Sequence, residues 1–548
     1  MEKSNSQKFS DAPEVQPEGA YKPVFGKRTI KELLIDLAIW IALTSYIVVF
    51  IIKGRGREGY EALILVYMFL SLRLYARHVS ISQTVYTPIT FAYNSTIGRA
   101  ISCIPERFRI PLMFGFTFSG LITSALVFPL GKGSTVLGRF QSLLGVIAFL
   151  AFMYGTSSNR KAIPWGTVAS GLTIQFFIAL FVLRTTIGFN IFNSFSKMIV
   201  TFLSFSETGM KFLIGPYEKT NFVLNVFPAL IFFSSFIYVL YFWGGIQYGI
   251  TKIAAVTLTI MGCSGSEAVV AAASPFVGQG ESALLVKPFV EFMTRSEIHS
   301  TMTSGFATIA GSVLLAYISF GIDASLLLTS CIMSVPASLL LSKMRLPETE
   351  ESLTIGKVNI PESKEKEANF LQAATNGSAT GVQIVLLVAG SVLAVISLYN
   401  SFEALVGFLF SMIDVYDTVN PKVDGKAPVV SVKMILSFLF FPFAWLMGIN
   451  VSEARQAGEV LALKMVVNEF VAYMSLASPT TQFSARTVQI LSFALCGFAN
   501  ISSIGIQIGT LSAIAPTRSR DFAELAVSAM LTGTVSTWLT AAVAGVIL

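Results

Sequence analysis

The chain has 548 residues, of which 53% are hydrophobic and only 13% are charged. Soluble domains carry roughly 25% charged residues, so this composition excludes a water-soluble fold and indicates a membrane protein. A net charge of +7 can reflect nucleic-acid binding, but the basic residues stand in short loops and at the N-terminus. Because that pattern is typical of membrane orientation, we expect a lipid bilayer and no nucleic acid as a partner.

The first predicted element is a polar, lysine-rich cytosolic tail over residues 1–32, too polar for a signal peptide. It is followed by apolar windows of about 20 residues, the length that crosses a hydrocarbon core of roughly 30 Å as a helix. We predict an all-α polytopic membrane protein with about eleven transmembrane helices. The predicted spans are residues 33–52, 60–78, 110–130, 139–156, 165–185, 222–244, 298–320, 324–342, 380–412, 486–510 and 522–546.

The basic loops predict the orientation of these spans in the membrane. With the N-terminus in the cytosol, most Lys and Arg residues of the loops fall on the cytosolic side, and the C-terminus is external. The cluster Lys53, Arg55 and Arg57 is the exception, because it falls outside. We expect the plasma membrane as the location.

Three apolar stretches do not have the pattern of simple spans. Residues 188–215 mix apolar and charged side chains and predict an interfacial amphipathic helix. Residues 257–293 are interrupted by Ser274–Pro275 and by Gly278–Glu281, and residues 452–480 are interrupted by Asn468–Glu469. We interpret both as re-entrant hairpins.

Each predicted hairpin is followed by two spans, the first of which carries small and polar residues at its middle. The loops place the two units in opposite orientations, and secondary transporters use such inverted repeats with broken helices to build a site near the bilayer midplane. The expected regions are additional N-terminal helices (33–138), scaffold helices with the interfacial helix (139–245), the first repeat (246–343), a cytosolic linker (344–379), a long scaffold helix with an external loop (380–428) and the second repeat (429–548).

Two carboxylates, Glu281 and Glu469, stand within apolar segments, where an ionised group costs at least about 2.5 kcal/mol. They either face an aqueous cavity and accept hydrogen bonds from a substrate, or form ion pairs with Lys287 and Lys464, respectively. The two histidines and four scattered cysteines supply no catalytic or metal-binding set, so we expect neither an enzyme nor a bound cofactor. An uncoupled channel is an alternative class.

The stretch around the second carboxylate carries a specific motif. Lys464, three further residues and then Asn-Glu-Phe-Val-Ala over 468–472 closely resemble the signature of the concentrative nucleoside transporter family. The resemblance runs from about residue 139 to the end, and the preceding spans resemble those of eukaryotic members by layout. Further family-like stretches are residues 157–163, 277–281, 309–313 and 494–500.

The resemblance implies a symporter that imports nucleosides by alternating access, usually as a homotrimer. A carboxylate can accept from both hydroxyls of a ribose, whereas an aromatic ring can cover a base. The implied nucleobase contacts are Gln279, Gly280, Glu281, Val313 and Phe498. The implied ribose contacts are Glu469, Asn500, Ser503 and Asn468.

The implied cation site departs from that of sodium-coupled members. Its positions here are Ser274, Val277, Thr308 and Ile309, and Ser274 replaces an Asn that supplies an oxygen to sodium. Gly280 replaces the usual Ser or Thr, and both departures resemble fungal-type, proton-coupled members. We therefore expect a proton, carried by Glu281 or Glu469. A sodium-coupled nucleoside symporter and a transporter of nucleobases or other small polar solutes are the alternatives.

Overall fold

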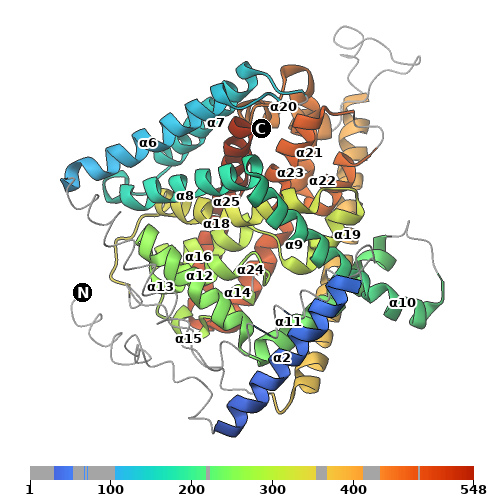
Figure 1. Cartoon of the computed structure of the whole chain (residues 1–548). Helices are drawn as coiled ribbons and strands as arrows, with labels where there is room; N and C mark the ends of the chain where they lie inside the picture. Colours follow the sequence, from blue (N-terminus) through green and yellow to red (C-terminus); the bar gives the residue numbers. More distant parts are fainter. Residues whose placement is uncertain are drawn as a thin grey trace.

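The computed structural model describes residues 30–53, 67, 71, 105–131, 133–216, 222–279, 281–352, 367–411, 432–478 and 482–548. Within these ranges the chain is almost entirely helical and contains no strand (Figure 1). The all-α fold is thereby confirmed. Residues 1–29 of the predicted tail 1–32 and most of the predicted span 60–78 lie outside the described residues. So do parts of the predicted cytosolic linker and of the external loop.

Five described helices are long and apolar enough to cross a membrane, and one bent helix pair adds a sixth candidate. These five helices are α6 (Glu106–Val127), α7 (Val136–Gly155), α8 (Trp165–Arg184), α18 (Ala324–Arg345) and α25 (Ser519–Ile547). Three further predicted spans, 33–52, 222–244 and 380–412, correspond to α2 (Ile30–Lys53), α11 (Phe222–Phe242) and α19 (Phe370–Ser411).

The other two predicted spans, 298–320 and 486–510, are each broken in the middle. The first consists of α16 (Arg295–Ala307), a short turn η4 (Gly311–Val313) and α17 (Leu314–Ser319). The second consists of α23 (Ala485–Leu495) and α24 (Ile501–Ile514). Both breaks fall on the small and polar residues at the middle of the predicted spans, so each span is two short helices instead of one continuous helix.

Both re-entrant hairpins are present. The first contains α13 (Gly265–Ala273), α14 (Glu281–Leu284) and α15 (Lys287–Val290), and the second contains α21 (Val451–Val466) and α22 (Glu469–Leu476). The predicted beginning of the first hairpin at residue 257 is wrong, because residues 257–261 belong to α12 (Gly245–Met261). The positive φ of +65° at Gly262 ends that helix, and the Ser264 side chain caps the next.

The two units run in opposite directions along α25. Arg295, the first residue of α16, forms ion pairs with Asp521 (2.6 Å) and Glu524 (3.0 Å) near the start of α25. Arg486, at the start of α23, donates to the carbonyl oxygen of Gly545 (2.8 Å) near the other end. The broken helices therefore begin at opposite ends of one central helix, which confirms the predicted inverted repeat.

The core of the protein is built around α25. This helix contacts α7, α8, α16, α18, α23 and α24, and 94% of its apolar window is buried. Its last carbonyl groups, which no helix can satisfy internally, accept from arginines of three other helices. Arg139 donates to Leu548 (3.0 Å), Arg184 to Ile547 (3.0 Å) and Arg486 to Gly545 (2.8 Å).

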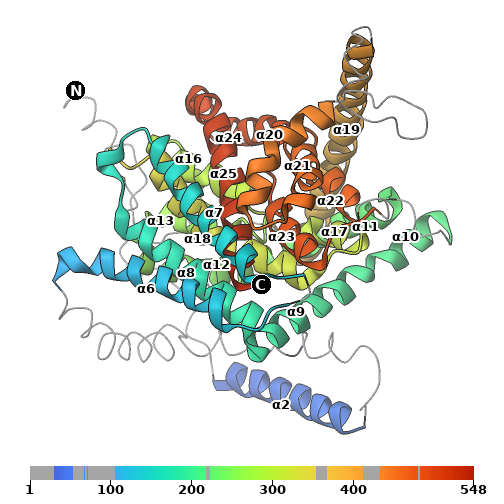
Figure 2. The same ribbon diagram turned by 90° about the horizontal axis from the view of Figure 1, so that it is seen from above.

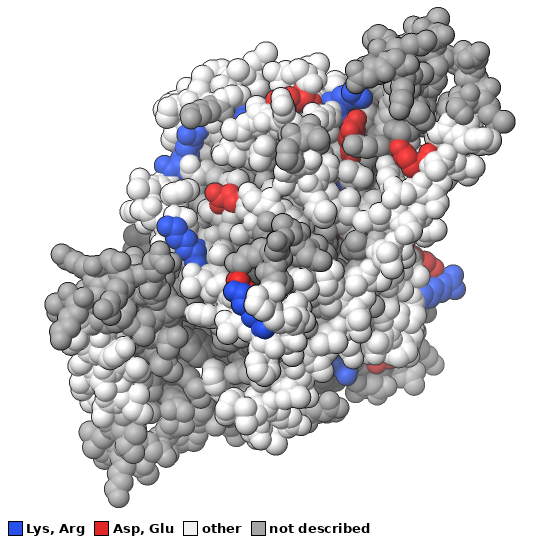
Figure 3. All heavy atoms as spheres, turned by 90° about the vertical axis from the view of Figure 1, so that its right-hand side faces the viewer, with Lys and Arg blue, Asp and Glu red and all other residues white. Residues whose placement is uncertain are grey.

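The periphery carries exposed apolar side chains. The segment predicted as interfacial forms α9 (Thr186–Ser204) and α10 (Ser206–Ile214), on which Ile187 and Phe212 are 70% and 89% exposed. Figure 2 shows α2 and α10 at the edges of the molecule. On the face in Figure 3 the described atoms are mostly uncharged. Such surfaces are suited to contact with lipid.

Helices α11 and α19 approach each other closely through glycines. A Cβ on Gly377 or Gly381 of α19 would lie only 2.7 Å from backbone atoms of α11. Glycines four residues apart allow this approach in membrane helices. The helix begins at Phe370, ten residues before the predicted span, because Asn369 accepts from the Gln372 N–H (2.9 Å) and caps the first turn.

This contact predicts opposite effects of the same substitution along α19. Gly381→Ala should lower the Tm by overpacking against Ile231, at a cost of about 1–3 kcal/mol. Gly390→Ala, which meets nothing within 4 Å, should leave the Tm unchanged or raise it, because alanine favours a helix by up to about 1 kcal/mol. Thermal unfolding of the purified variants in detergent measures both, and equal Tm values would contradict the close approach.

Candidate functional site

The centre of the candidate site is the Glu469 carboxylate, which is buried at the tip of the second hairpin. Its Oε2 accepts a hydrogen bond from Asn500 Nδ2 (2.9 Å), and its Oε1 accepts one from the Tyr317 hydroxyl (3.3 Å). Glu469 is the first residue of α22, where the helix dipole favours a negative charge. The hairpin and both broken helices therefore meet at this one side chain.

The local sequence explains why the hairpin turns at this residue. Asn468 adopts an extended backbone and accepts the Val471 N–H (3.0 Å), so it caps α22. The preceding helix ends two residues earlier, at Val466. The predicted break at Asn468–Glu469 is thus the N-terminus of a new helix, with its cap and its carboxylate next to each other.

Asn500 caps the second half of the second broken helix. Its Oδ1 accepts from the Ser503 N–H (2.8 Å) and the Ser502 hydroxyl (2.7 Å), while its amide nitrogen donates to Glu469. Ser503 is buried one turn along the same face. The predicted ribose residues Glu469, Asn500 and Ser503 are therefore linked by the contacts of one amide.

Lys464, which the sequence offered as an ion-pair partner for Glu469, bonds elsewhere. Its ammonium donates to the Ala494 carbonyl (2.8 Å) and to the Thr537 hydroxyl (3.0 Å). Among the described residues it makes no ion pair with Glu469. Lys464 instead satisfies a carbonyl at the end of α23, a group that the break leaves without a helical partner.

The tip of the first hairpin carries Gln279. This side chain is buried, and its Oε1 has no hydrogen-bond partner among the described residues. A Cβ on Gly305 of α16 would lie 2.9 Å from the Gln279 carbonyl oxygen, so the tip rests directly against the first broken helix. Gly280 and the side chain of Glu281 lie outside the described residues, as does any pairing with Lys287.

The two predicted apolar walls lie at the two breaks. Val313 is buried in η4, and Phe498 is partly buried in the break after α23. The Phe498 N–H donates to the Thr308 carbonyl (3.2 Å), which joins the two breaks to each other. Gly497 is required beside this contact, because a Cβ there would lie 2.8 Å from the Phe306 carbonyl oxygen.

The two hydroxyls of the predicted cation site each donate to a carbonyl of the preceding helix. Ser274 bonds to the Val270 carbonyl (2.8 Å) and also lies 3.4 Å from the Ser282 hydroxyl, and Thr308 donates to the Ser304 carbonyl (2.9 Å). Ile309 is buried and Val277 is partly buried. The described contacts contain no hydrogen bond that joins Ser274 to Thr308.

Two polar residues of this region were missed in the sequence. Tyr317 is fully buried, and its ring lies against Tyr473 (centroids 4.6 Å apart) while its hydroxyl reaches Glu469. Gln507 is fully buried on α24, and neither its oxygen nor its nitrogen has a partner within the part of the chain that the structure describes. The spacing of Asn500, Ser503 and Gln507 (i, i+3, i+7) is a helical-face signal that the sequence does contain.

Family models match most of the chain from residue 144 onward. Residues 144–217 match the Na+ dependent nucleoside transporter N-terminus, residues 223–324 match a gate domain described as nucleoside recognition, and residues 326–545 match the Na+ dependent nucleoside transporter C-terminus. The hairpins and broken helices of the site all lie in the last two regions.

Relatives and solved structures cover the same part of the chain. Human solute carrier family 28 member 3 is 36% identical over 77% of this chain, which spans only 62% of that relative's length. The uncharacterized transporter YutK of Bacillus subtilis is 38% identical over 74% of this chain and 98% of its own length. The structure of CNTnw in an inward-facing substrate-bound state is 35% identical, covers 75% of this chain and 98% of its own, and superposes with a TM-score of 0.69. These matches show that the chain belongs to the concentrative nucleoside transporter family.

Proposed function

We propose that this protein is a symporter that imports nucleosides against their gradient. The observation that carries the proposal is the buried hydrogen bond between Glu469 and Asn500 (2.9 Å), where a hairpin tip meets the break of a helix. A carboxylate and an amide at such a junction suit a ligand rich in hydroxyl groups, because together they accept and donate. The names of the family models and of the relatives support nucleosides as that ligand.

The ribose is assigned to the Glu469 side of the site. Glu469, Asn500 and Ser503 would take its hydroxyls, with Asn468 holding the hairpin tip in place. The base is assigned to the first hairpin and the apolar walls. The residues proposed for the base are Gln279, Gly280, Glu281, Val313 and Phe498, and the orphaned oxygen of Gln279 supports a polar contact to the edge of the base.

The co-transported cation is proposed to be a proton. Ser274 supplies a single short hydroxyl where sodium-coupled members carry an Asn, and a hard cation such as sodium needs several well-placed oxygens. Glu469 is buried and forms no direct ion pair among the described residues, because the nearby Lys464 ammonium donates to Ala494 and Thr537 instead. Burial penalises the charged form of a carboxyl group. One charge moving down a potential supplies about 2.3 kcal/mol per 100 mV, enough for accumulation by tens-fold.

The plasma membrane, a cytosolic N-terminus and a homotrimer remain predictions. They follow from the basic loops and from the family. Labelling of single cysteines in the tail and loops with an impermeant reagent on intact cells tests the first two, and the mass of the purified complex tests the third.

Glu469→Gln is expected to reduce ribonucleoside uptake at least about 100-fold. The reason is that the glutamine amide cannot accept hydrogen bonds from two ribose hydroxyls and from Asn500 at the same time. Uptake of labelled uridine and adenosine into proteoliposomes measures the loss. Glu351→Gln, which removes an exposed carboxylate beyond the end of α18, is the matched control and should transport normally. Normal ribonucleoside uptake by Glu469→Gln would contradict the ribose assignment. If the variant lost nucleobase uptake to the same extent as ribonucleoside uptake, a nucleobase transporter would be favoured.

Gln507→Leu is expected to raise the Tm and lower the rate of uptake. Leucine removes two buried polar atoms without partners, but it also removes an amide about 6 Å beyond Ser503 along α24, where a moving nucleoside would pass. Uptake kinetics and thermal unfolding of the same preparation separate the two effects. Ile506→Leu, which alters a side chain of α24 that is 39% exposed, is the control. Uptake that stays at the wild-type rate would exclude Gln507 from the pathway.

The identity of the co-transported cation is tested by imposing ion gradients on proteoliposomes that initially contain neither uridine nor adenosine. An inwardly directed proton gradient should drive uphill uptake of uridine and adenosine, and a protonophore should collapse it. A sodium gradient at equal pH should have no effect. Stimulation by sodium alone would overturn the proton proposal and leave nucleoside symport intact, whereas uptake that never exceeds equilibrium under either gradient would indicate a channel.

A further inference from the structure

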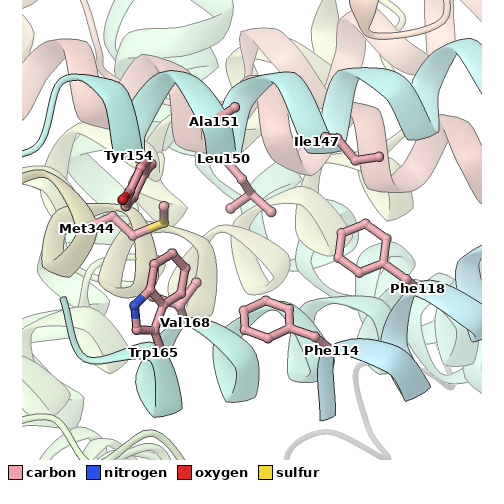
Figure 4. A pocket seen from close by; sticks show the side chains of 9 residues that line it. All are labelled: Phe114, Phe118, Ile147, Leu150, Ala151, Tyr154, Trp165, Val168 and Met344. Carbon is pink, nitrogen blue, oxygen red and sulfur yellow. The ribbon is translucent and has the colours of Figure 1, made fainter. Parts of the chain in front are cut away.

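A cavity of about 290 Å³ lies between α6, α7 and α8, and it shares no lining residue with the candidate site (Figure 4). Phe114 and Phe118 of α6 form one wall, Leu150 of α7 points into the space, and Met344 of α18 contributes a thioether at one end. Among the side chains that line it, only Tyr154 and Trp165 carry a polar atom. Because most of this lining is apolar, the space suits a hydrocarbon group better than ordered water, which needs two to four polar partners.

The cavity lies next to a surface suited to lipid. Only 22% of the apolar window of α6 is buried, and Leu112 and Phe116 on the outer face of this helix are each 57% exposed. Two lining residues, Ile147 and Trp165, are themselves 48% and 39% exposed. Acyl chains of the surrounding bilayer can therefore reach the space from the side.

One end of the cavity lies close to a cluster of cations. Tyr154 is in the last turn of α7 and Trp165 begins α8, so both mark the membrane–water boundary. Arg160 and Lys161 stand in the short connection between them. The Arg160 guanidinium lies 5.6 Å from the centre of the Tyr154 ring and donates to the Gly155 carbonyl (2.6 Å).

The start of α6 adds to this charge. Helices α6 and α8 run parallel, because Phe114 contacts Trp165 (centroids 6.2 Å apart) and Thr117 bonds to Thr173 (2.7 Å). Arg107 at the beginning of α6 therefore lies on the same side of the membrane as Arg160 and Lys161. This side is the expected cytosolic face, where anionic lipids concentrate.

We propose that this cavity is a binding site for one anionic glycerophospholipid, with an acyl chain between Phe114 and Leu150 and the phosphate held by Arg160 and Lys161. The aromatic walls match a flexible hydrocarbon chain, and the guanidinium and ammonium groups match a phosphate. A sterol would fill the apolar space but leave both cations without an anionic partner. The site is independent of the transported substrate.

The test uses the full chain, purified and delipidated in detergent micelles, with dioleoyl-phosphatidylserine, dioleoyl-phosphatidylcholine or cholesterol added in turn. Phosphatidylserine should raise the Tm by roughly 2 °C or more, and the other two should raise it less. Leu150→Trp, which fills the cavity, should lose this rise, whereas Leu144→Trp on the 47% exposed outer side of α7 should keep it. The double variant Arg160→Gln/Lys161→Gln should respond equally to phosphatidylserine and phosphatidylcholine, and Lys197→Gln/Lys211→Gln on α9 and α10 should respond as the wild type does.

An unchanged phosphatidylserine effect in Leu150→Trp would overturn the acyl-chain site, and a Tm that rises with cholesterol alone would assign the cavity to a sterol instead. If Leu150→Trp does not fold, brominated phosphatidylserine gives a second measurement. It should quench the tryptophan fluorescence of the wild type more than that of Trp165→Phe, whose remaining tryptophans are elsewhere. Equal quenching of the two proteins would also overturn the proposal.

Discussion

The crossing of the two broken helices is the constraint on which the rest of the transport core depends. A helix that stops inside the membrane leaves carbonyl and N–H groups that lipid cannot satisfy. Here the Phe498 N–H donates to the Thr308 carbonyl, and Lys464 donates to the Ala494 carbonyl. The two breaks thus satisfy one group of each other, and the hairpin helix α21 satisfies a further carbonyl. Gly497 makes this exchange sterically feasible, because any side chain there would collide with Phe306.

Some polar side chains of the site likewise have two structural functions. Asn500 caps α24 through its oxygen and holds Glu469 through its nitrogen, so one amide both starts a helix and forms the candidate binding site. Tyr317 comes from the first repeat and reaches the carboxylate of the second. A displacement of either repeat therefore alters the surroundings of Glu469, and a ligand that replaces one of these contacts acts on both repeats at once.

Much of this architecture could be predicted from the sequence, because its signals are local. The breaks at Asn468–Glu469 and after Ala273 stand out as polar or small residues in apolar runs. The early start of α19 and the end of α12 were not predictable from hydropathy, since they depend on an Asn cap and on a positive φ at Gly262. Tyr317 was missed because its partner lies 152 residues away. The partners of Lys464, Ala494 and Thr537, could not be predicted either, because they come close to it only in the folded structure.

The enclosure of α25 has a consequence for how the molecule is assembled. It is the last of the described helices, yet it is the most enclosed of the five clear spans, and α7, α8, α16, α18, α23 and α24 all lie against it. Five of its hydroxyl groups bond to its own backbone carbonyls, so its polar residues can enter the membrane without waiting for partners. The helices that surround α25 are synthesised before it, so they cannot reach their final arrangement until this segment has been made. A substitution that lets them pack against one another first would leave α25 against lipid.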